Sequence, residues 1–229
     1  MMNHKQLQQR LAALGHYDGA IDGLFGPKSK GAVIAALTSG PDYPLTDHDV
    51  AQAASHLGVE PAKIWAVYEV ESSGSPFIDG RPTILFEPHR FAKATGQRYN
   101  ASHPSLSSRF WNKALYPRGQ AARYQQLVDA VALDVDAGFA SASYGGFQIL
   151  GENYAVCDAV DSWSFAWRQA QTEGDQLHAF TLFVAGNGLK GALQRGDWAG
   201  FAKGYNGTAF RANKYDERLA AAYARRKSA

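Results

Sequence analysis

The stretch EVESSGSPFIDGRPTILFEPHRF holds four carboxylates, those of Glu69, Glu71, Asp79 and Glu87. Most residues around them are apolar or small, and burying an unpaired carboxylate is costly. Such surroundings raise the pKa of a carboxyl group, which then stays protonated near neutral pH and can donate a proton to a glycosidic oxygen. The stretch therefore indicates acid–base chemistry.

Glu71 is the carboxylate best placed for that chemistry. It ends the stretch PAKIWAVYEVE, which is predicted to be a helix with proline at its first position. Ile64, Val67 and Tyr68 precede Glu71 by seven, four and three residues, so the carboxylate shares their apolar face. The helix dipole also disfavours a negative charge in the last turn. Both effects favour the neutral acid, although a glutamate that merely caps the next turn would show the same spacing.

The elements that follow are predicted to form a cleft around this helix end. The segments FI and TILF read as short strands of a hairpin with the turn DGRP between them. An amphipathic helix over residues 122–140 leads into SASYGGFQILG, where two glycines let the backbone approach a ligand and Gln148 presents an amide. The later stretch DWAGFAKGYNG is predicted to be a helix that places Asn206 at its end, within reach of the cleft.

Composition excludes several classes of function. The chain has 229 residues, 45% hydrophobic and 12% aromatic, which suffices for one packed domain and a smaller unit. A single cysteine, Cys157, excludes an intrachain disulfide, and the seven histidines show no metal-ligand grouping, so no metal or other cofactor is expected. Lone histidines such as His89 are expected to be structural. The sequence has no phosphate loop and no interleaved basic and aromatic surface, which argues against nucleic-acid binding.

Charge and hydropathy predict where the chain works. No apolar run approaches the roughly 18 residues that span a bilayer, and the start MMNHKQLQQRLAALG lacks the apolar region of a signal peptide, so a soluble protein is expected. Residues 203–229 carry a net charge of +5 and end in Arg225-Arg226-Lys227, which predicts weak attraction to an anionic envelope surface. The alternative is that these cations complement a helix C-terminus.

The segment SGPDYPL marks a break between two units. We predict a binding module over residues 1–40, a linker over 41–47 and a larger domain over 48–229. The first unit combines two short helices with two Asp-Gly turns, and it resembles the peptidoglycan-binding module found beside cell-wall hydrolases. The resemblance is carried by Leu7-Gln8, Leu14-Gly15, Tyr17, Asp22-Gly23, Phe25-Gly26 and Ala32-Val33. It implies that the wall-binding residues are Tyr17, Asp22, Gly23 and Phe25.

The larger unit carries a second resemblance. Glu71-Ser72, Tyr144-Gly145-Gly146-Phe147-Gln148 and Tyr205-Asn206-Gly207 occur in the order seen in goose-type lysozymes and soluble lytic transglycosylases. The fuller series, over about residues 48–224, resembles the N-acetylmuramidase domain of bacteriophage endolysins. The whole chain thus resembles a modular endolysin from a phage of Gram-negative bacteria. This implies a mainly α fold, with a lysozyme-like α+β catalytic domain that contains a small β-hairpin, and a small helical binding module.

The endolysin resemblance also implies residue roles. Glu71 is the general acid, which protonates the oxygen of the β-1,4 bond between N-acetylmuramic acid and N-acetylglucosamine. Glu87 is the first choice for a base that positions water, and Asp79 is the alternative. A separation of about 6.5–9.5 Å from Glu71 would suit inversion. The residues implied to hold the sugars are Ser72, Tyr144, Gly145, Gly146, Gln148, Tyr205, Asn206 and Tyr215, of which Tyr215 could instead hydrogen-bond to Glu71.

Several alternative functions stay open at this stage. A lytic transglycosylase needs a single acid/base and forms an anhydro-muramic product without water. A metal-dependent or Cys157-dependent wall amidase and a non-catalytic wall-binding protein are further alternatives. The endolysin interpretation predicts a monomer that is made in the host cytoplasm without a signal peptide and is released, by a holin, to the periplasmic peptidoglycan, where it lyses the host.

Overall fold

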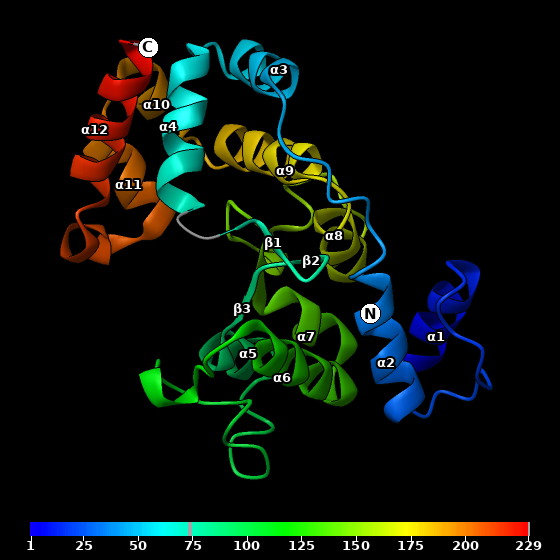
Figure 1. Ribbon diagram of the computed structural model, residues 1–229. Helices are drawn as coiled ribbons and strands as arrows, with labels where there is room; N and C mark the ends of the chain where they lie inside the picture. The colour runs from blue at the N-terminus through cyan, green and yellow to red at the C-terminus, as the bar shows by residue number, and fades with distance from the viewer. Residues whose placement is uncertain (73–74, 229) are drawn as a thin grey trace.

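The computed structural model describes residues 1–72 and 75–228. Helices dominate it and two small antiparallel sheets complete it, so the predicted mainly α fold is confirmed (Figure 1). The helices are α1 (His4–Ala13), α2 (Pro27–Ala36), α3 (Asp47–Leu57), α4 (Pro61–Glu71), α5 (Pro88–Ala94), α6 (Gln120–Leu133), α7 (Val135–Ala140), α8 (Ser162–Gln169), α9 (Glu173–Gly186), α10 (Lys190–Arg195), α11 (Trp198–Asn206) and α12 (Tyr215–Lys227). The strands are β1 (Phe77–Ile78), β2 (Arg81–Pro82), β3 (Ile84–Phe86), β4 (Ala142–Tyr144) and β5 (Ile149–Leu150).

The helix that carries Glu71 lies at the centre of one helical group. α4 begins at Pro61, and its apolar residues Ile64, Val67 and Val70 are buried. It packs along α12 and against α3, and Figure 1 shows these helices together with α9 to α11 on the opposite side of the small sheet from α5 and α6. The buried stripe on α4 thus fixes the direction in which its last residue, Glu71, points.

The hairpin is tighter than the sequence analysis predicted. Asp79 and Gly80 both have positive φ, 53° and 70°, as a two-residue hairpin turn with the right twist requires. Residues 77–78 therefore pair with residues 81–82, and the segment TILF leaves the hairpin. It becomes β3 of a separate sheet with the order β3-β4-β5, in which Ile84 lies opposite Tyr144.

The long helix predicted over residues 122–140 is divided in the structure. Asp134 has an extended backbone and ends α6, and its side chain accepts a hydrogen bond from the backbone N–H of Ala137 at 3.0 Å. An aspartate in this position caps the next helix in preference to continuing the first. The break turns α7 towards β4, which it contacts.

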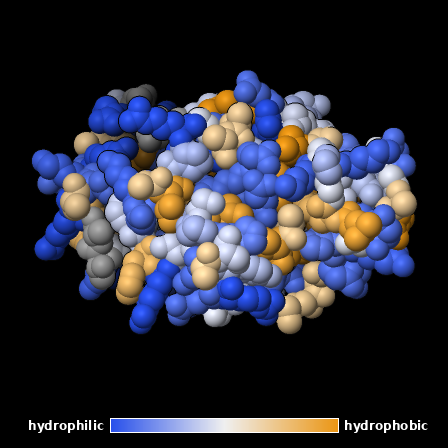
Figure 2. Space-filling model, turned by 90° about the horizontal axis from the view of Figure 1, so that it is seen from below, coloured by the Kyte–Doolittle hydropathy of each residue, from blue (hydrophilic) through white to orange (hydrophobic). Residues whose placement is uncertain are grey.

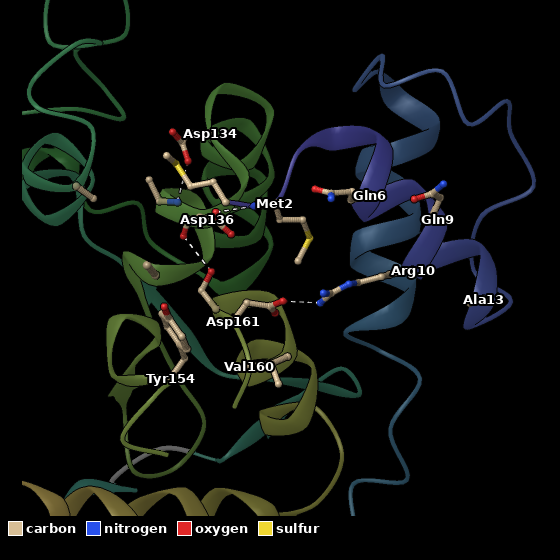
Figure 3. A pocket seen from close by; sticks show the side chains of 15 residues that line it. Met2, Gln6, Gln9, Arg10, Ala13, Asp134, Asp136, Tyr154, Val160 and Asp161 are labelled. Atoms are coloured by element: carbon tan, nitrogen blue, oxygen red, sulfur yellow. Dashed lines mark hydrogen bonds and ion pairs between the residues drawn. The ribbon is translucent and has the colours of Figure 1, made fainter. Parts of the chain in front are cut away.

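The first two helices pack onto the rest of the protein. Leu7, Leu11 and Val33 belong to the same buried core as the catalytic unit. Lys30 pairs with Asp129 of α6 at 2.5 Å, and other polar contacts reach α7 and α8. A cavity of about 770 Å³ remains between α1 and these two helices, bridged by the ion pair of Arg10 with Asp161 at 2.6 Å (Figure 3). The predicted linker thus joins two units that share an interface.

Candidate active site

Glu71 lies at the end of α4 with one hydrogen bond from a distant element. Nδ2 of Asn206, the last residue of α11, donates to Oε1 of Glu71 at 3.1 Å. Burial raises the pKa of Glu71 to about 7, while the Asn206 hydrogen bond and the positive charge of Arg218 act against that rise. Close to neutral pH the carboxyl can therefore exist in either protonation state, as a group that gives up and regains a proton requires.

Arg218 of α12 is a part of this site that sequence analysis missed. Its Nη2 donates to the carbonyl oxygen of Val70 at 3.0 Å, beside Glu71. Its guanidinium lies over the ring of Tyr215, 5.4 Å from the centroid. No local pattern marks Arg218, because an arginine near the start of an exposed helix is ordinary and its contact with α4 depends on tertiary packing.

The two predicted tyrosines differ in their role. The hydroxyl of Tyr205 donates to the carbonyl oxygen of Phe147 at 2.6 Å, so this ring helps to hold α11 against the glycine loop. Burial, followed by the negative charge of Glu71, raises the pKa of both Tyr205 and Tyr215. Tyr215 is thus close enough to interact electrostatically with Glu71, but within the described parts of the chain the carboxylate receives its hydrogen bond from Asn206.

The glycine loop over residues 145–148 is built by protein contacts. The N–H of Gly145 donates to the carbonyl oxygen of Thr83 at 2.8 Å, and the N–H of Gly146 donates to Oε1 of the buried Gln176 at 2.7 Å. A side chain at Gly145 would collide with that Gln176 amide, 2.3 Å from where Cβ would stand. The glycines therefore leave room for the Gln176 side chain. Both N–H groups bond to the protein, so they are not available to hold a sugar, contrary to the prediction.

Two further predictions about this loop need correction. The amide of Gln148 donates to the carbonyl oxygens of Gly145 and Thr83, and its Oε1 accepts from Ser143, so it shapes the loop instead of facing a sugar. Tyr144 is fully buried, and its hydroxyl donates to the carbonyl oxygen of Phe139 at 2.9 Å. It is a core residue and cannot form a wall of a sugar subsite.

Ser72 lies between the helix end and the loop. Its Oγ donates back to the carbonyl oxygen of Tyr68 at 2.5 Å, and its Cβ is 3.4 Å from where a Cβ on Gly146 would stand. The catalytic helix and the glycine loop are therefore in direct contact. Residues 73 and 74, which follow, lie outside the described residues.

The two candidates for a second carboxylate lie in different places. Asp79 is exposed at the hairpin tip, where the next residue, Gly80, lies against Thr38 at the end of the module. Glu87 follows β3, and its Oε2 lies 3.3 Å from Nε2 of His89. Burial raises the pKa of Glu87, the charge of Arg90 opposes that rise, and the charge of Glu152 adds to it.

The residues that identify the small module are its framework. The buried amide of Gln8 donates towards the Tyr17 hydroxyl, the Asp22 carboxylate and two further oxygens, and its Oε1 accepts from the N–H of Gly23 at 2.8 Å. Phe25 packs its ring 5.0 Å from that of His4. These contacts fix the connector between α1 and α2, and within the described residues the Tyr17 hydroxyl, Oδ1 of Asp22 and the N–H of Gly23 bond to other groups of the module.

The basic C-terminal run is also engaged in part. Arg225 and Arg226 both pair with Glu69, which lies on the exposed side of α4, and the guanidinium of Arg226 covers the ring of Trp65. These contacts join α12 to α4. Two of the three terminal cations that were predicted to attract an anionic envelope are therefore paired with Glu69. Their role in joining α12 to α4 explains why they are present.

The described residues contain neither a metal-binding cluster nor a membrane-spanning helix. Among residues 1–72 and 75–228, no cluster of three His, Cys, Asp or Glu side chains could hold a metal ion. None of the helices found in those same ranges has the length and the apolar character that crossing a bilayer demands.

Replacing Asn206 by Ala tests the geometry of the site. The Asn206 hydrogen bond lowers the pKa of Glu71, so its loss is expected to move the alkaline limb of the pH–activity profile to higher pH. The measurement is kcat/KM on soluble glycan across that limb. Asn187→Ala is the control, because this exposed asparagine follows the end of α9 and its side chain donates to the carbonyl oxygen of Phe183, in its own helix. A limb that stays in place or moves to lower pH would contradict the assignment.

Comparison with known proteins agrees with the sequence resemblances. Residues 60–227 match the family described as N-acetylmuramidase, and residues 3–36 match the family described as putative peptidoglycan binding domain. The crystal structure of Burkholderia AP3 phage endolysin is similar with a TM-score of 0.75 and 32% sequence identity, over 99% of this chain and 96% of that one. No curated protein sequence matches the chain.

Proposed function

The chain belongs to the N-acetylmuramidase family and has the modular organisation of a phage endolysin that cleaves peptidoglycan, and from this premise we propose that Glu71 protonates the β-1,4 bond between N-acetylmuramic acid and N-acetylglucosamine. The observation that carries the proposal is the place of Glu71 at the end of α4, where its carboxylate accepts a hydrogen bond from Asn206 and burial raises its pKa to about 7. A protonated glutamic acid of this kind serves as the general acid of a glycosidase.

The hydrogen bond from Asn206 orients the proton. Because Nδ2 of Asn206 donates to Oε1, that oxygen acts as an acceptor, and the acidic proton resides on Oε2. The proton passes from Oε2 to the glycosidic oxygen as the bond to the anomeric carbon breaks. The resulting carboxylate is stabilised by the same Asn206 hydrogen bond and by the charge of Arg218.

We propose that Glu87 binds substrate and does not activate water. Oε2 of Glu87 lies 3.3 Å from Nε2 of His89, and the charges of Arg90 and Glu152 act on the pKa of Glu87. With Glu87 engaged by His89, a second candidate function is that of a lytic transglycosylase, in which the muramic hydroxyl attacks in place of water and no second carboxylate is needed.

The chemical nature of the product distinguishes the two reactions. We expect digestion of purified peptidoglycan to release muropeptides that end in N-acetylmuramic acid with a free reducing end. Borohydride treatment followed by mass spectrometry measures this directly, because it reduces that end and leaves an anhydro product unchanged. Anhydro products would overturn hydrolysis, and cleavage only within the peptide would overturn the assignment to a glycosidic bond.

The place of action is also part of the proposal. Similarity to a phage endolysin supports action on the cell wall, and we propose that the protein acts on the periplasmic peptidoglycan of the host, as a monomer released by a holin. The small module packs against α6 to α8, so it presents the catalytic unit to the wall in a fixed orientation.

A further inference from the structure

The segment over residues 108–116, between α5 and α6, exposes two large aromatic side chains. We call it the aromatic loop. The Phe110 side chain is 71% exposed and the Trp111 side chain 63% exposed, and the guanidinium of Arg109 lies 5.2 Å from the Phe110 ring. Neither aromatic ring belongs to the buried core, so the apolar faces of both rings are accessible to a ligand.

Hydrogen bonds hold the base of the aromatic loop in place. Nε2 of Gln126 donates to the carbonyl oxygens of Ser105 and Leu115, at 3.1 and 2.9 Å, and so joins the two ends of the loop. The backbone N–H of Ser108 donates to the carbonyl oxygen of Pro88, and the Ser108 hydroxyl donates to the carbonyl oxygen of Phe110 at 2.8 Å. The two rings are therefore presented on an ordered support, which lowers the entropic cost of binding a ligand.

A polar chain connects the aromatic loop to Glu87. The ring of Trp111 lies 6.0 Å from that of Tyr116, whose hydroxyl is 3.3 Å from Nδ1 of His89. Burial lowers the pKa of His89, which favours the neutral ring. A neutral His89 with its proton on Nε2 accepts from Tyr116 and donates to Glu87 at 3.3 Å. His89 thus positions a carboxylate beside the aromatic loop.

The sheet connects this polar chain to the catalytic end of the molecule. Side chains alternate along β3, so Ile84 and Phe86 are buried on one face while Leu85 and Glu87 lie on the other. At the start of β3, the carbonyl oxygen of Thr83 bonds to the glycine loop that touches Ser72. From Thr83 to Glu87 the strand covers about 13 Å. This distance is longer than one sugar ring.

We propose that Phe110, Trp111 and Tyr116, together with Glu87, form a distal subsite for the peptidoglycan glycan strand. The aromatic rings cover the apolar C–H faces of pyranose rings, and the carboxylate accepts hydrogen bonds from their hydroxyls. The proposal rests on the proposed function, since it needs a glycan that extends from Glu71 along β3. Figure 2, which views the side where α5 and α6 lie, shows small separate apolar patches among polar residues. That distribution suits a polar polymer better than a membrane.

The dependence of binding on glycan length tests the subsite. The full chain with Glu71→Gln is expected to cleave glycan only slowly, and its dissociation constants for peptide-free peptidoglycan tetrasaccharide and octasaccharide are measured by calorimetry. We expect the octasaccharide to bind at least about tenfold more tightly. The added double substitution Phe110→Ala/Trp111→Ala should abolish that gain and leave tetrasaccharide affinity unchanged. Tyr43→Ala is the matched control, because this ring is 67% exposed in the linker.

The possible outcomes distinguish a glycan subsite from a membrane-binding loop. An octasaccharide preference that survives the double substitution overturns the proposal. Loss of binding to phosphatidylglycerol vesicles with unchanged glycan binding would also overturn it and assign the loop to a membrane. Since the rings are exposed, the melting temperature should not change. Wall lysis by the Glu71→Gln protein at close to the natural rate would contradict the proposed acid, whereas the difference between the two glycans reports on the loop alone.

Discussion

Replacing Glu71 by Gln is expected to reduce kcat/KM on purified peptidoglycan by roughly 10²–10⁴-fold, the range for loss of a general acid. Glutamine keeps the shape of the side chain, and its carbonyl oxygen can still accept the hydrogen bond from Asn206. What is lost is the proton on the second oxygen. Release of reducing ends from soluble glycan measures the effect without any contribution from wall binding.

Two other glutamates serve as matched controls. Glu69 lies two residues earlier on the exposed side of the same helix and pairs with Arg225 and Arg226, so Glu69→Gln should leave activity within about twofold. Glu87→Gln should raise KM on a long glycan, which reaches the distal subsite, and leave kcat nearly unchanged. If Glu87→Gln instead lowers kcat as much as Glu71→Gln, Glu87 is the second catalytic carboxylate and our assignment of it to sugar binding is wrong.

Glu71 could be proposed as the acid from sequence because the properties that suggest this role are local. The spacing from Ile64 to Glu71 and the position in the last turn already predicted an apolar environment and a raised pKa, and the structure agrees. Arg218 and Gln176 could not be found in this way. Their contacts join residues that lie far apart in the chain, and neither residue type is unusual for the helix that carries it.

The motifs predicted where the loop lies better than they predicted what its side chains bind. Gly145, Gln148 and Tyr144 correctly marked the loop beside the catalytic helix, but their polar groups bond to the protein itself. Tyr17 and Asp22 mark the small module in the same way, through the buried amide of Gln8. A motif whose residues fix a backbone shape looks the same in sequence as a motif whose residues contact a ligand. Hydrogen-bond partners distinguish the two.

The raised pKa of Glu71 also has a consequence for stability. Its pKa is 4.5 when unperturbed and about 7 in the folded protein, so between these values the folded state binds a proton more tightly than the unfolded state. The free energy of unfolding therefore falls as pH rises through this window. For Glu71 alone the loss is about 3 kcal/mol, complete above about pH 7.

Glu71→Gln should remove this dependence, because glutamine does not titrate. The difference in unfolding free energy between the variant and the natural protein is expected to shift in favour of the variant by about 3 kcal/mol from pH 4 to pH 8. Urea unfolding at several pH values measures it, and other titrating groups cancel in the difference. Glu69→Gln should show the opposite sign, since the hydrogen bond from Arg225 lowers the pKa of Glu69 and its contribution is lost as pH falls. Parallel curves for Glu71→Gln and the natural protein would mean that Glu71 titrates normally, and a general acid active at neutral pH would then have to be sought elsewhere.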